Sequence, residues 1–439
     1  MAVLGACSAE HAAPRLTSPI VPPTSVEGEE AAGPHEPAPA DSVGGPEGST
    51  PETTAAVPGD TGDPTTSVAA PTTVAPDRWA AFDQALSARL LGSGDYAVGV
   101  AVAVDGEIVH RAEFGYRVPP PFVPSASSTP PSSTPPESTT TTTVAAPAAE
   151  PIEPGDRFRI ASISKVITAI VVLQLVEAGQ LGLDEPVGQR LADSVGATIT
   201  DPQVAAVTVR QLLAHTSGFA SYQSTFFRAQ VESCPAAGQY GLSRGLRAPP
   251  GTEYTYSNLN YCLLGLLVED IAGRPYEAVV TDRLLAPLGI EGMRLASTYD
   301  PDPRQVVHPS APFRNYMEVL GAAGSWVATP SDVVAIMASL DVANPGFHPL
   351  SQGLVDLMRT PVLTASRTDP ARGYGLGMMA FGDGAYGHTG TVENTHAMVV
   401  DRADGVTWSV LVSGEYPGNT GNLAGIFDRS IADAGVTFR

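Results

Sequence analysis

A serine and a lysine stand three residues apart at the start of a long apolar segment. They are Ser162 and Lys165, in the stretch RFRIASISKVITAIVVLQLVEAGQL, which runs from Arg157 to Leu181. Residues i and i+3 share one face of a helix, so a helix that begins near Ser162 places the hydroxyl beside the amine. The serine would then lie at a helix N-terminus, where backbone N–H groups favour developing negative charge.

The residues after Lys165 suggest what a lysine does at this position. VITAIVVLQLV is apolar on nearly every face, which is typical of a central, buried helix. Burial disfavours the ammonium and lowers the pKa of a lysine, so Lys165 could take the proton of the serine. The alternative is a serine that caps a helix and a lysine that extends to solvent. Ser164 points to another part of the helix and is not the expected nucleophile.

Two further motifs help to decide between these interpretations. Tyr256-Ser257-Asn258 precedes a second apolar helix, and His388-Thr389-Gly390 precedes a strand pattern. Taken singly, Tyr256 could be a core tyrosine and His388 a turn residue. However, S-x-x-K occurs with companion motifs of this kind in penicillin-recognising enzymes. The three motifs in this order therefore favour catalysis.

Together the motifs resemble those of the serine β-lactamase and penicillin-binding-protein superfamily. The chain is most similar to the class C-like branch, especially to actinomycete D-alanyl-D-alanine carboxypeptidases. Supporting stretches are LQLVEAGQLGLDEPV, VTVRQLLAHTSGF, PLGIEGM, GSWVATPSDVVAIM and GYGLG. The resemblance implies an α+β fold of the β-lactamase/transpeptidase type. This fold has an antiparallel sheet flanked by helices plus an all-helical lobe, with the site between them.

The resemblance also implies which residues carry the reaction. Ser162 would be acylated, and Lys165 and Tyr256 would share the proton transfers, with the tyrosine protonating the leaving group. These three residues supply nucleophile, base and acid, so we expect neither a metal nor a cofactor. His215, in LLAHTSGF, is interpreted as structural because that stretch ends a helix at Gly218.

A second group of residues is expected to bind the substrate. Asn258 would hydrogen-bond the substrate or the lysine. His388, Thr389 and Gly390 would lie on an edge strand that lines the cleft and pairs with an extended acyl group. The backbone N–H groups of Ser162 and Thr391 would form the oxyanion hole, with Thr391 also contacting the substrate.

Two departures from the family pattern concern the substrate. The carboxypeptidases carry basic side chains after GYGLG, where the terminal carboxylate is held, whereas this chain has Met378-Met379-Ala380-Phe381. His388 replaces the more common lysine and gives only partial positive charge near neutral pH. Glu393 follows the third motif and is expected to repel a substrate anion at the cleft wall.

The departures leave three hypotheses about function. The first is an exported serine hydrolase, similar to a DD-carboxypeptidase, that cleaves an amide or ester, such as a peptidoglycan stem peptide, through a Ser162 acyl-enzyme. The second is an esterase or β-lactamase that prefers neutral substrates, because the cation is missing. The third is an inactive cell-wall binding protein, which a long tether would suit.

Composition excludes several other partners. The chain of 439 residues has a net charge of −22, which argues against nucleic acid and against electrostatic docking on anionic lipid. No segment reaches the roughly 20 apolar residues of a membrane span. We expect a monomer that acts on a small-molecule or peptide substrate.

The N-terminal residues predict a lipid anchor. Leu4-Gly5-Ala6-Cys7 resembles a bacterial lipobox, in which Cys7 is acylated, although the usual upstream signal is incomplete. The alternative is a free cysteine in an unstructured tail. Residues 1–7 are interpreted as a signal remnant and residues 8–76 as a disordered tether rich in Pro, Thr and acidic residues. The expected location is the outer face of the cytoplasmic membrane.

The hydrolase domain is expected at 77–439, with a Pro/Thr-rich insertion at 119–151 and a helical lobe at about 182–325. Apolar spacing predicts a helix at 77–91, and hairpins are expected around Asp105-Gly106 and Asp404-Gly405. Strands at both ends of the domain favour one mixed sheet. If the protein is exported, Cys234 and Cys262 could form a disulfide; the alternative is that Cys262 is a buried thiol.

Overall fold

The computed structural model describes residues 76–120, 149–298, 301–308, 314–364 and 372–438. The expected signal remnant, nearly all of the expected tether and most of the expected insertion lie outside these ranges. The strands on either side of that insertion are β2 (Glu107–Val118) and β3 (Glu150–Pro151), and they pair with each other. The two flanks of the insertion therefore meet at one edge of a sheet.

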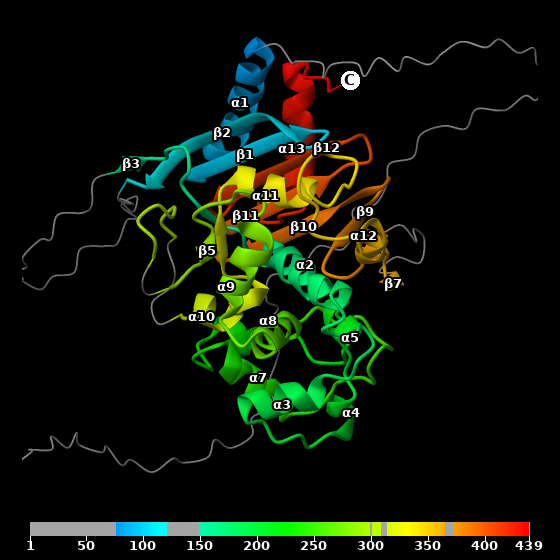
Figure 1. Ribbon diagram of the computed structural model, residues 1–439. Helices are drawn as coiled ribbons and strands as arrows, with labels where there is room; N and C mark the ends of the chain where they lie inside the picture. Colours follow the sequence, from blue (N-terminus) through cyan, green and yellow to red (C-terminus); the bar gives the residue numbers. More distant parts are fainter. Residues whose placement is uncertain (1–75, 121–148, 299–300, 309–313, 365–371, 439) are drawn as a thin grey trace, which may run out of the picture. The chain divides into compact units, whose positions relative to one another are not determined.

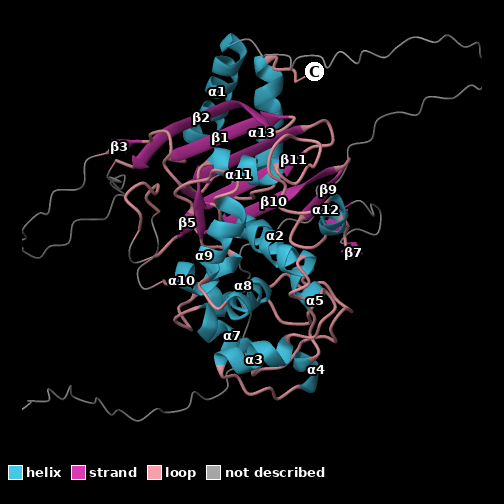
Figure 2. Ribbon diagram, viewed as in Figure 1, coloured by secondary structure: helices cyan, strands magenta, loops and turns pink. Residues whose placement is uncertain are grey.

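The described residues form a nine-stranded sheet in the order β3-β2-β1-β12-β11-β10-β9-β8-β7 (Figures 1 and 2). Its other strands are β1 (Ala97–Val104), β7 (Leu363–Thr364), β8 (Arg372–Tyr374), β9 (Met379–Gly382), β10 (Ala385–Val392), β11 (Thr395–Asp401) and β12 (Val406–Ser413).

All neighbouring strands of this sheet are antiparallel. The antiparallel sheet implied by the resemblance is confirmed, and the mixed sheet expected from the strand pattern is wrong. Tight turns join β1 to β2, β9 to β10 and β10 to β11, and strands joined in this way must run in opposite directions. The first and last strands, β1 and β12, pair along their full length, so the two ends of the domain lie side by side inside the sheet.

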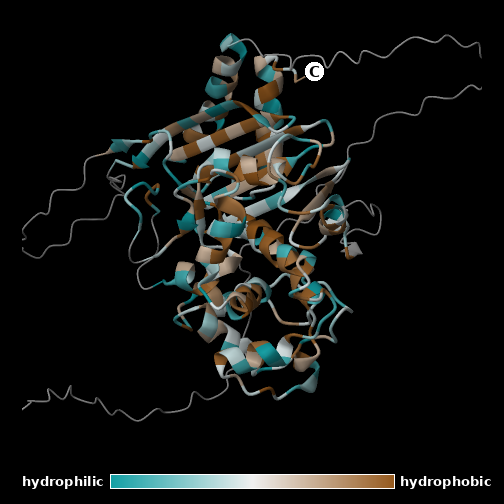
Figure 3. Ribbon diagram, in the orientation of Figure 1, coloured by the Kyte–Doolittle hydropathy of each residue, from teal (hydrophilic) through white to brown (hydrophobic). Residues whose placement is uncertain are grey.

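The sequence of β1, AVGVAVAV, explains why helices cover both faces of the sheet. Alternate residues point to opposite faces, so the valines share one face and the small residues share the other. The valines pack against α1 (Pro76–Leu90) and α13 (Asn422–Ala434). The small residues lie beneath α11 (Pro330–Ala338), where a Cβ on Gly99 would come within 2.6 Å of the Pro330 ring. Figure 3 shows this apolar character along β1.

A second, three-stranded sheet leads the chain into the segment that carries Ser162. It has the order β4-β6-β5, with β4 at Phe158–Arg159, β6 at Trp326–Ala328 and β5 at Arg294–Leu295. The backbone N–H of Ile160 continues this pairing by donating to the Trp326 carbonyl at 3.1 Å. The segment before Ser162 is therefore anchored to residues far away in the sequence.

Helices occupy most of the region between β4 and β6. They are α2 (Ser164–Glu177), α3 (Gly188–Val195), α4 (Pro202–Ala205), α5 (Val209–Leu213), α6 (Gln223–Phe227), α7 (Cys234–Leu242), α8 (Asn258–Ala272), α9 (Tyr276–Val280) and α10 (Tyr316–Leu320), and α12 (Gln352–Arg359) follows α11. Short helical turns are η1 (Leu91–Ser93), η2 (Ala161–Ile163), η3 (Thr281–Leu285) and η4 (Gly321–Ala323). Within the part of the chain that the structure describes, no helix is both long and apolar enough to cross a membrane.

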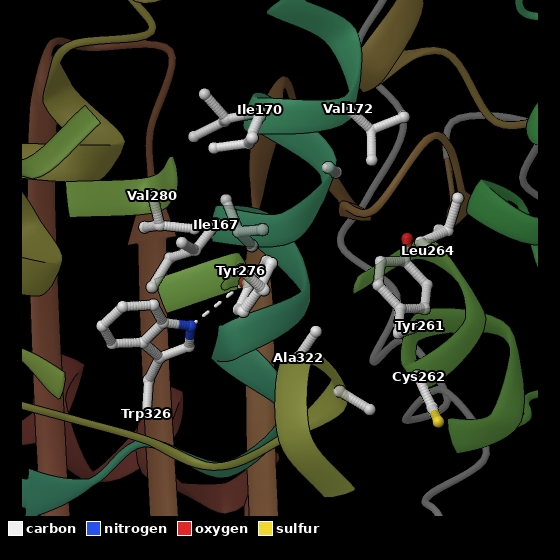
Figure 4. Packing of buried hydrophobic residues seen from close by; sticks show 14 of the residues in the cluster. Ile167, Ile170, Val172, Tyr261, Cys262, Leu264, Tyr276, Val280, Ala322 and Trp326 are labelled. Atoms are coloured by element: carbon white, nitrogen blue, oxygen red, sulfur yellow. Dashed lines mark hydrogen bonds between the residues drawn. The ribbon is translucent and has the colours of Figure 1, made fainter. Parts of the chain in front are cut away.

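The two most apolar of these helices, α2 and α8, pack against each other and hold the centre of the core. Figure 4 shows the aromatic side chains beside α2. The Trp326 indole N–H donates to the Tyr276 hydroxyl at 3.1 Å. The same hydroxyl lies 2.8 Å from the Thr168 hydroxyl on α2. Both aromatic side chains are buried, so these hydrogen bonds fix α9 and β6 against α2.

We predict that Tyr276→Phe destabilises the fold, because the substitution leaves the buried Trp326 N–H without this acceptor. An unsatisfied buried donor costs about 1–3 kcal/mol, which should appear as a lower free energy of unfolding in urea titrations. Tyr116→Phe, at a side chain that is 41% exposed, is the matched control and should leave the free energy unchanged. Equal stability of the Tyr276→Phe protein and the parent would show that the hydrogen bond contributes nothing.

Candidate active site

Ser162 lies in the turn η2, directly before α2, and its side chain is partly exposed. The preceding residue, Ala161, has φ of 46°, which is uncommon for a residue other than glycine. Such a conformation costs energy and persists only where the surrounding structure imposes it. Here β4 and the Ile160–Trp326 hydrogen bond fix the residues before Ala161, and the buried helix α2 fixes the residues after the turn.

Lys165, one turn along from Ser162, is fully buried. Its Nζ lies 3.0 Å from the Ser162 hydroxyl oxygen, 2.8 Å from Oδ1 of Asn258 and 2.8 Å from the carbonyl oxygen of Ala323. The amide and carbonyl oxygens can only accept hydrogen bonds, so each takes an N–H of the lysine. A neutral amine bonded in this way has its lone pair left for the hydroxyl of Ser162.

Tyr256 lies on the other side of the lysine, in the segment that leads into α8. Its ring centre is 4.9 Å from Nζ of Lys165. The next residue, Ser257, holds this segment in place, because its N–H donates to Nδ1 of His215 at 3.2 Å and its hydroxyl donates to the Ala220 carbonyl at 2.7 Å. The structure therefore brings together Ser162, Lys165, Tyr256 and Asn258 from two separate helix starts.

His388, in β10, is fully buried and close to this group. Its Nδ1 lies 2.5 Å from the Thr389 carbonyl oxygen, so Nδ1 carries a proton and Nε2 accepts from the Tyr374 hydroxyl at 3.0 Å. Burial, and secondly the charge of Lys165, lowers the pKa of His388 to about 3. The imidazole is thus neutral near pH 7, so this position brings no positive charge to the site.

The next two residues of β10 have different surroundings. The hydroxyl of Thr389 donates to the sulfur of Met379 at 3.6 Å. A Cβ on Gly390 would lie 2.4 Å from the Ile160 carbonyl oxygen and 3.2 Å from the Ser162 nitrogen. Only glycine allows β10 to approach the turn η2 this closely.

The expected edge strand is an edge over only part of its length. β9 pairs with Ala385, Tyr386 and Gly387 of β10, whereas the register with β9 does not extend to residues 388–392. Among the residues that the structure describes, Gly390 and the exposed Thr391 thus pair with β11 on one side and with no strand on the other. This segment passes the backbone nitrogen of Ser162, which is the arrangement that an oxyanion hole built from Ser162 and Thr391 requires.

Three residues near the lysine were not selected from the sequence as part of the site. Ala323 contributes only its backbone carbonyl, so its side chain carries no signal. Tyr374, within the GYGLG stretch, donates to His388. His215, interpreted as structural, is fully buried with its ring centre 4.3 Å from that of Tyr256. Burial, followed by Lys165 and His388, lowers its pKa well below the usual value, so it packs on Tyr256 as a neutral ring.

Glu393 does not present the unpaired negative charge that the sequence suggested. Its carboxylate lies 2.6 Å from the guanidinium of Arg314, and its backbone carbonyl accepts from Nε2 of His308. The expectation that it repels a substrate anion is therefore corrected, because Arg314 compensates its charge. The sequence could not reveal this pair, which joins residues from separate segments.

Cys234 and Cys262 are joined by a disulfide, with their Cα atoms 5.7 Å apart. The bridge links the start of α7 to α8, four residues after Asn258. Gly321, in the turn η4, packs on Cys234, where a Cβ would lie 3.3 Å from the cysteine Cβ. The disulfide thus stabilises α8 and the turn η4, which supply the Asn258 and Ala323 oxygens that bind Lys165. Cys7 lies outside the described residues, and within those residues no group of three or more His, Cys, Asp or Glu side chains could hold a metal ion.

Comparison with known proteins finds relatives of this chain that include an esterase and a penicillin-binding protein. The chain is 32% identical over 260 residues to penicillin-binding protein 4 of Amycolatopsis lactamdurans, covering 53% of this chain and 65% of that protein. It is 28% identical over 327 residues to esterase EstB of Burkholderia gladioli, covering 63% and 82%. Several other curated relatives are matched over about half of their own length.

A solved structure shares the fold at lower identity. The D-amino acid amidase from Ochrobactrum anthropi SV3, in complex with L-phenylalanine, aligns with a TM-score of 0.63 and 21% identity. The alignment covers 82% of this chain and all of the amidase chain. The family described as Beta-lactamase matches residues 82–433, a range that contains the serine, the lysine and all three motifs. The chain therefore belongs to the Beta-lactamase family, a family of hydrolases.

Proposed function

We propose that the protein is a serine hydrolase that cleaves an amide or ester bond through an acyl-enzyme on Ser162. One observation carries the proposal: the buried amine of Lys165 lies 3.0 Å from the hydroxyl of Ser162. Asn258 and Ala323 each accept an N–H of the amine, which holds it beside the serine. This is the arrangement of a nucleophile and its base.

In the proposed reaction the hydroxyl oxygen of Ser162 attacks the substrate carbonyl carbon while Lys165 takes the hydroxyl proton. The carbonyl oxygen becomes negative and is held by the N–H groups of Ser162 and Thr391. The bond to the leaving group then breaks, Tyr256 gives the departing nitrogen or oxygen its phenolic proton, and Lys165 passes the proton taken from Ser162 back to Tyr256. Water attacks the resulting ester and loses a proton to the same groups, which releases the acid and restores Ser162.

The first candidate substrate is a D-alanyl-D-alanine peptide, such as a peptidoglycan stem peptide. The similarity to a penicillin-binding protein supports it. The part of β10 that β9 does not cover also supports this substrate, because an extended acyl chain can pair with it as an added strand. Pairing of the backbone would align the scissile bond with the turn that carries Ser162.

A specific observation favours a second candidate, an ester or lactam without a free carboxylate. Thr389 faces the thioether of Met379, where a guanidinium would be needed to hold a carboxylate. The neutral state of His388 adds no charge there. The similarity to an esterase agrees with this candidate. The third hypothesis, an inactive binding protein, is disfavoured by the contact between Ser162 and Lys165.

We also propose that the protein is exported and anchored through a lipid on Cys7, so that no membrane span is needed. The disulfide between Cys234 and Cys262 supports export, because such bonds persist in oxidising compartments. Mass spectrometry of the protein from a bacterial membrane fraction would test for diacylglycerol on Cys7.

Ser162→Ala is predicted to abolish covalent labelling by a fluorescent penicillin or a fluorophosphonate, since both reagents react with an activated serine hydroxyl. Intact mass spectrometry would measure the adduct. Ser164→Ala is the matched control: Ser164 lies two residues away, and its hydroxyl oxygen accepts from the backbone N–H of Trp326. Labelling should persist in this control. Equal labelling of the Ser162→Ala protein and the parent would show that Ser162 is not the nucleophile.

Met379→Arg should change substrate preference, because it places a guanidinium beside the Thr389 hydroxyl. A hydrogen bond to a charged group contributes about 1.5–3 kcal/mol, so kcat/KM for a D-Ala-D-Ala peptide should rise about tenfold or more. The kcat/KM for a neutral p-nitrophenyl ester should not rise. Met379→Leu, which keeps the position apolar, should change neither value. The second candidate would be wrong if the parent already prefers the peptide and Met379→Arg does not raise kcat/KM for it.

A further inference from the structure

A chain of hydrogen bonds runs from the Thr391 side chain through two buried side chains that the proposed reaction does not use. The Thr391 hydroxyl is 2.5 Å from the hydroxyl of Thr420, which is 2.8 Å from Nδ1 of His396. Nε2 of His396 lies 3.3 Å from the Glu415 carbonyl oxygen. Thr420 and His396 are both buried, whereas Thr391 is exposed.

The direction of these hydrogen bonds follows from their last member. The Glu415 carbonyl can only accept, so Nε2 of His396 carries the proton. Burial lowers the pKa of His396, which keeps the ring neutral and leaves Nδ1 as an acceptor. Thr420 therefore donates to Nδ1, and its oxygen accepts from Thr391. Each hydroxyl proton has one assigned partner, so the chain holds Thr391 in one orientation.

The register of the sheet shows where this chain acts. Thr391 of β10 is directly opposite His396 of β11, so the two side chains share one face of the sheet. Gly390 points to the opposite face, where it meets the turn of Ser162. The part of β10 that β9 does not support is thus fixed from both faces at adjacent residues. On the face towards Ser162, Gly390 packs against the backbone of the turn η2. On the opposite face, the hydrogen-bond chain fixes Thr391.

We propose that Thr420 and His396 are positioning residues for the oxyanion hole. They act through the side chain of Thr391, which sets the place of the Thr391 N–H relative to the N–H of Ser162. The inference rests on the proposed function, because the two N–H groups matter only if Ser162 forms a tetrahedral intermediate. A donor must lie within hydrogen-bond distance of the oxygen in the transition state, so a small displacement of β10 lowers the rate of the chemical step.

The test compares Thr420→Val, which replaces the hydroxyl by a methyl group of similar size, with Thr420→Ser, which restores it. The reagent is a fluorophosphonate, and the measured quantities are the maximal rate of labelling, kinact, and the half-saturating concentration, KI. Removing a whole oxyanion-hole donor costs about 10²–10³ in rate, so a displaced donor should cost about tenfold. Thr420→Val should therefore lower kinact about tenfold without changing KI, and Thr420→Ser should recover most of the loss.

Thr407→Val is the matched control, because the Thr407 hydroxyl is also buried in the sheet but donates to Asp401, at the other end of β11 and β12. A general loosening of the sheet would affect this control as well, whereas positioning predicts an unchanged kinact. His396→Phe should lower kinact as Thr420→Val does, and the double variant should lose no more than either one, since all three break one chain.

Two outcomes would overturn the inference. If the parent reacts at Ser162 and Thr420→Val has the kinact of the parent, the chain does not position the oxyanion hole. The same conclusion follows if Thr407→Val is slowed as much as Thr420→Val. Failure of the parent itself to be labelled at Ser162 is a separate result, which would remove the proposed function together with this inference.

Discussion

The structure depends on one contact, between a lysine that has no access to water and the serine beside it. The amine of Lys165 donates to Oδ1 of Asn258 and to the carbonyl oxygen of Ala323, which are both uncharged acceptors. The helices α2 and α8 cross at this point because their apolar faces are continuous. The same packing that stabilises the core therefore also keeps solvent from the amine. Core stability and chemical reactivity are properties of one region.

The second constraint is the approach of β10 to the turn that carries Ser162. The turn η2 is not part of the sheet that holds β10, so packing sets the distance between them. Gly390 permits the approach, and the left-handed Ala161 turns the chain so that the Ser162 nitrogen faces it. Strain at Ala161 is maintained by well-packed neighbours on both sides, as is common where geometry serves a reaction.

Much of the fold and part of the site could be predicted from the sequence. The spacing of Ser162 and Lys165, with the apolar segment that follows, was sufficient to predict their proximity, since the turn η2 that holds Ser162 runs directly into α2, which holds Lys165. The Asp105-Gly106 turn and the alternation in β1 are equally local, and they predicted the first hairpin.

The features that could not be predicted depend on residues distant in sequence. The sequence pattern indicates which segments are strands but not which of them are neighbours, so a mixed sheet was expected where every pair is antiparallel. The pairing of Glu393 with Arg314 and the contact of Thr420 with Thr391 require the tertiary structure. The residue type of Ala161 does not indicate its positive φ. The role of Ala323 depends on its backbone carbonyl, which every residue has, so the sequence could not predict it.

The pairing of β1 with β12 has a consequence for how the molecule is made. Residues 97–104 leave the ribosome long before residues 406–413, which must lie beside them in the finished sheet. Until then, the hairpin of β1 and β2 lacks the neighbour that β12 provides along β1. The sheet therefore cannot form completely before the last strands are synthesised. Pairing strands so far apart in the sequence is slow, which leaves time for a chaperone to bind the chain while it is still unfolded.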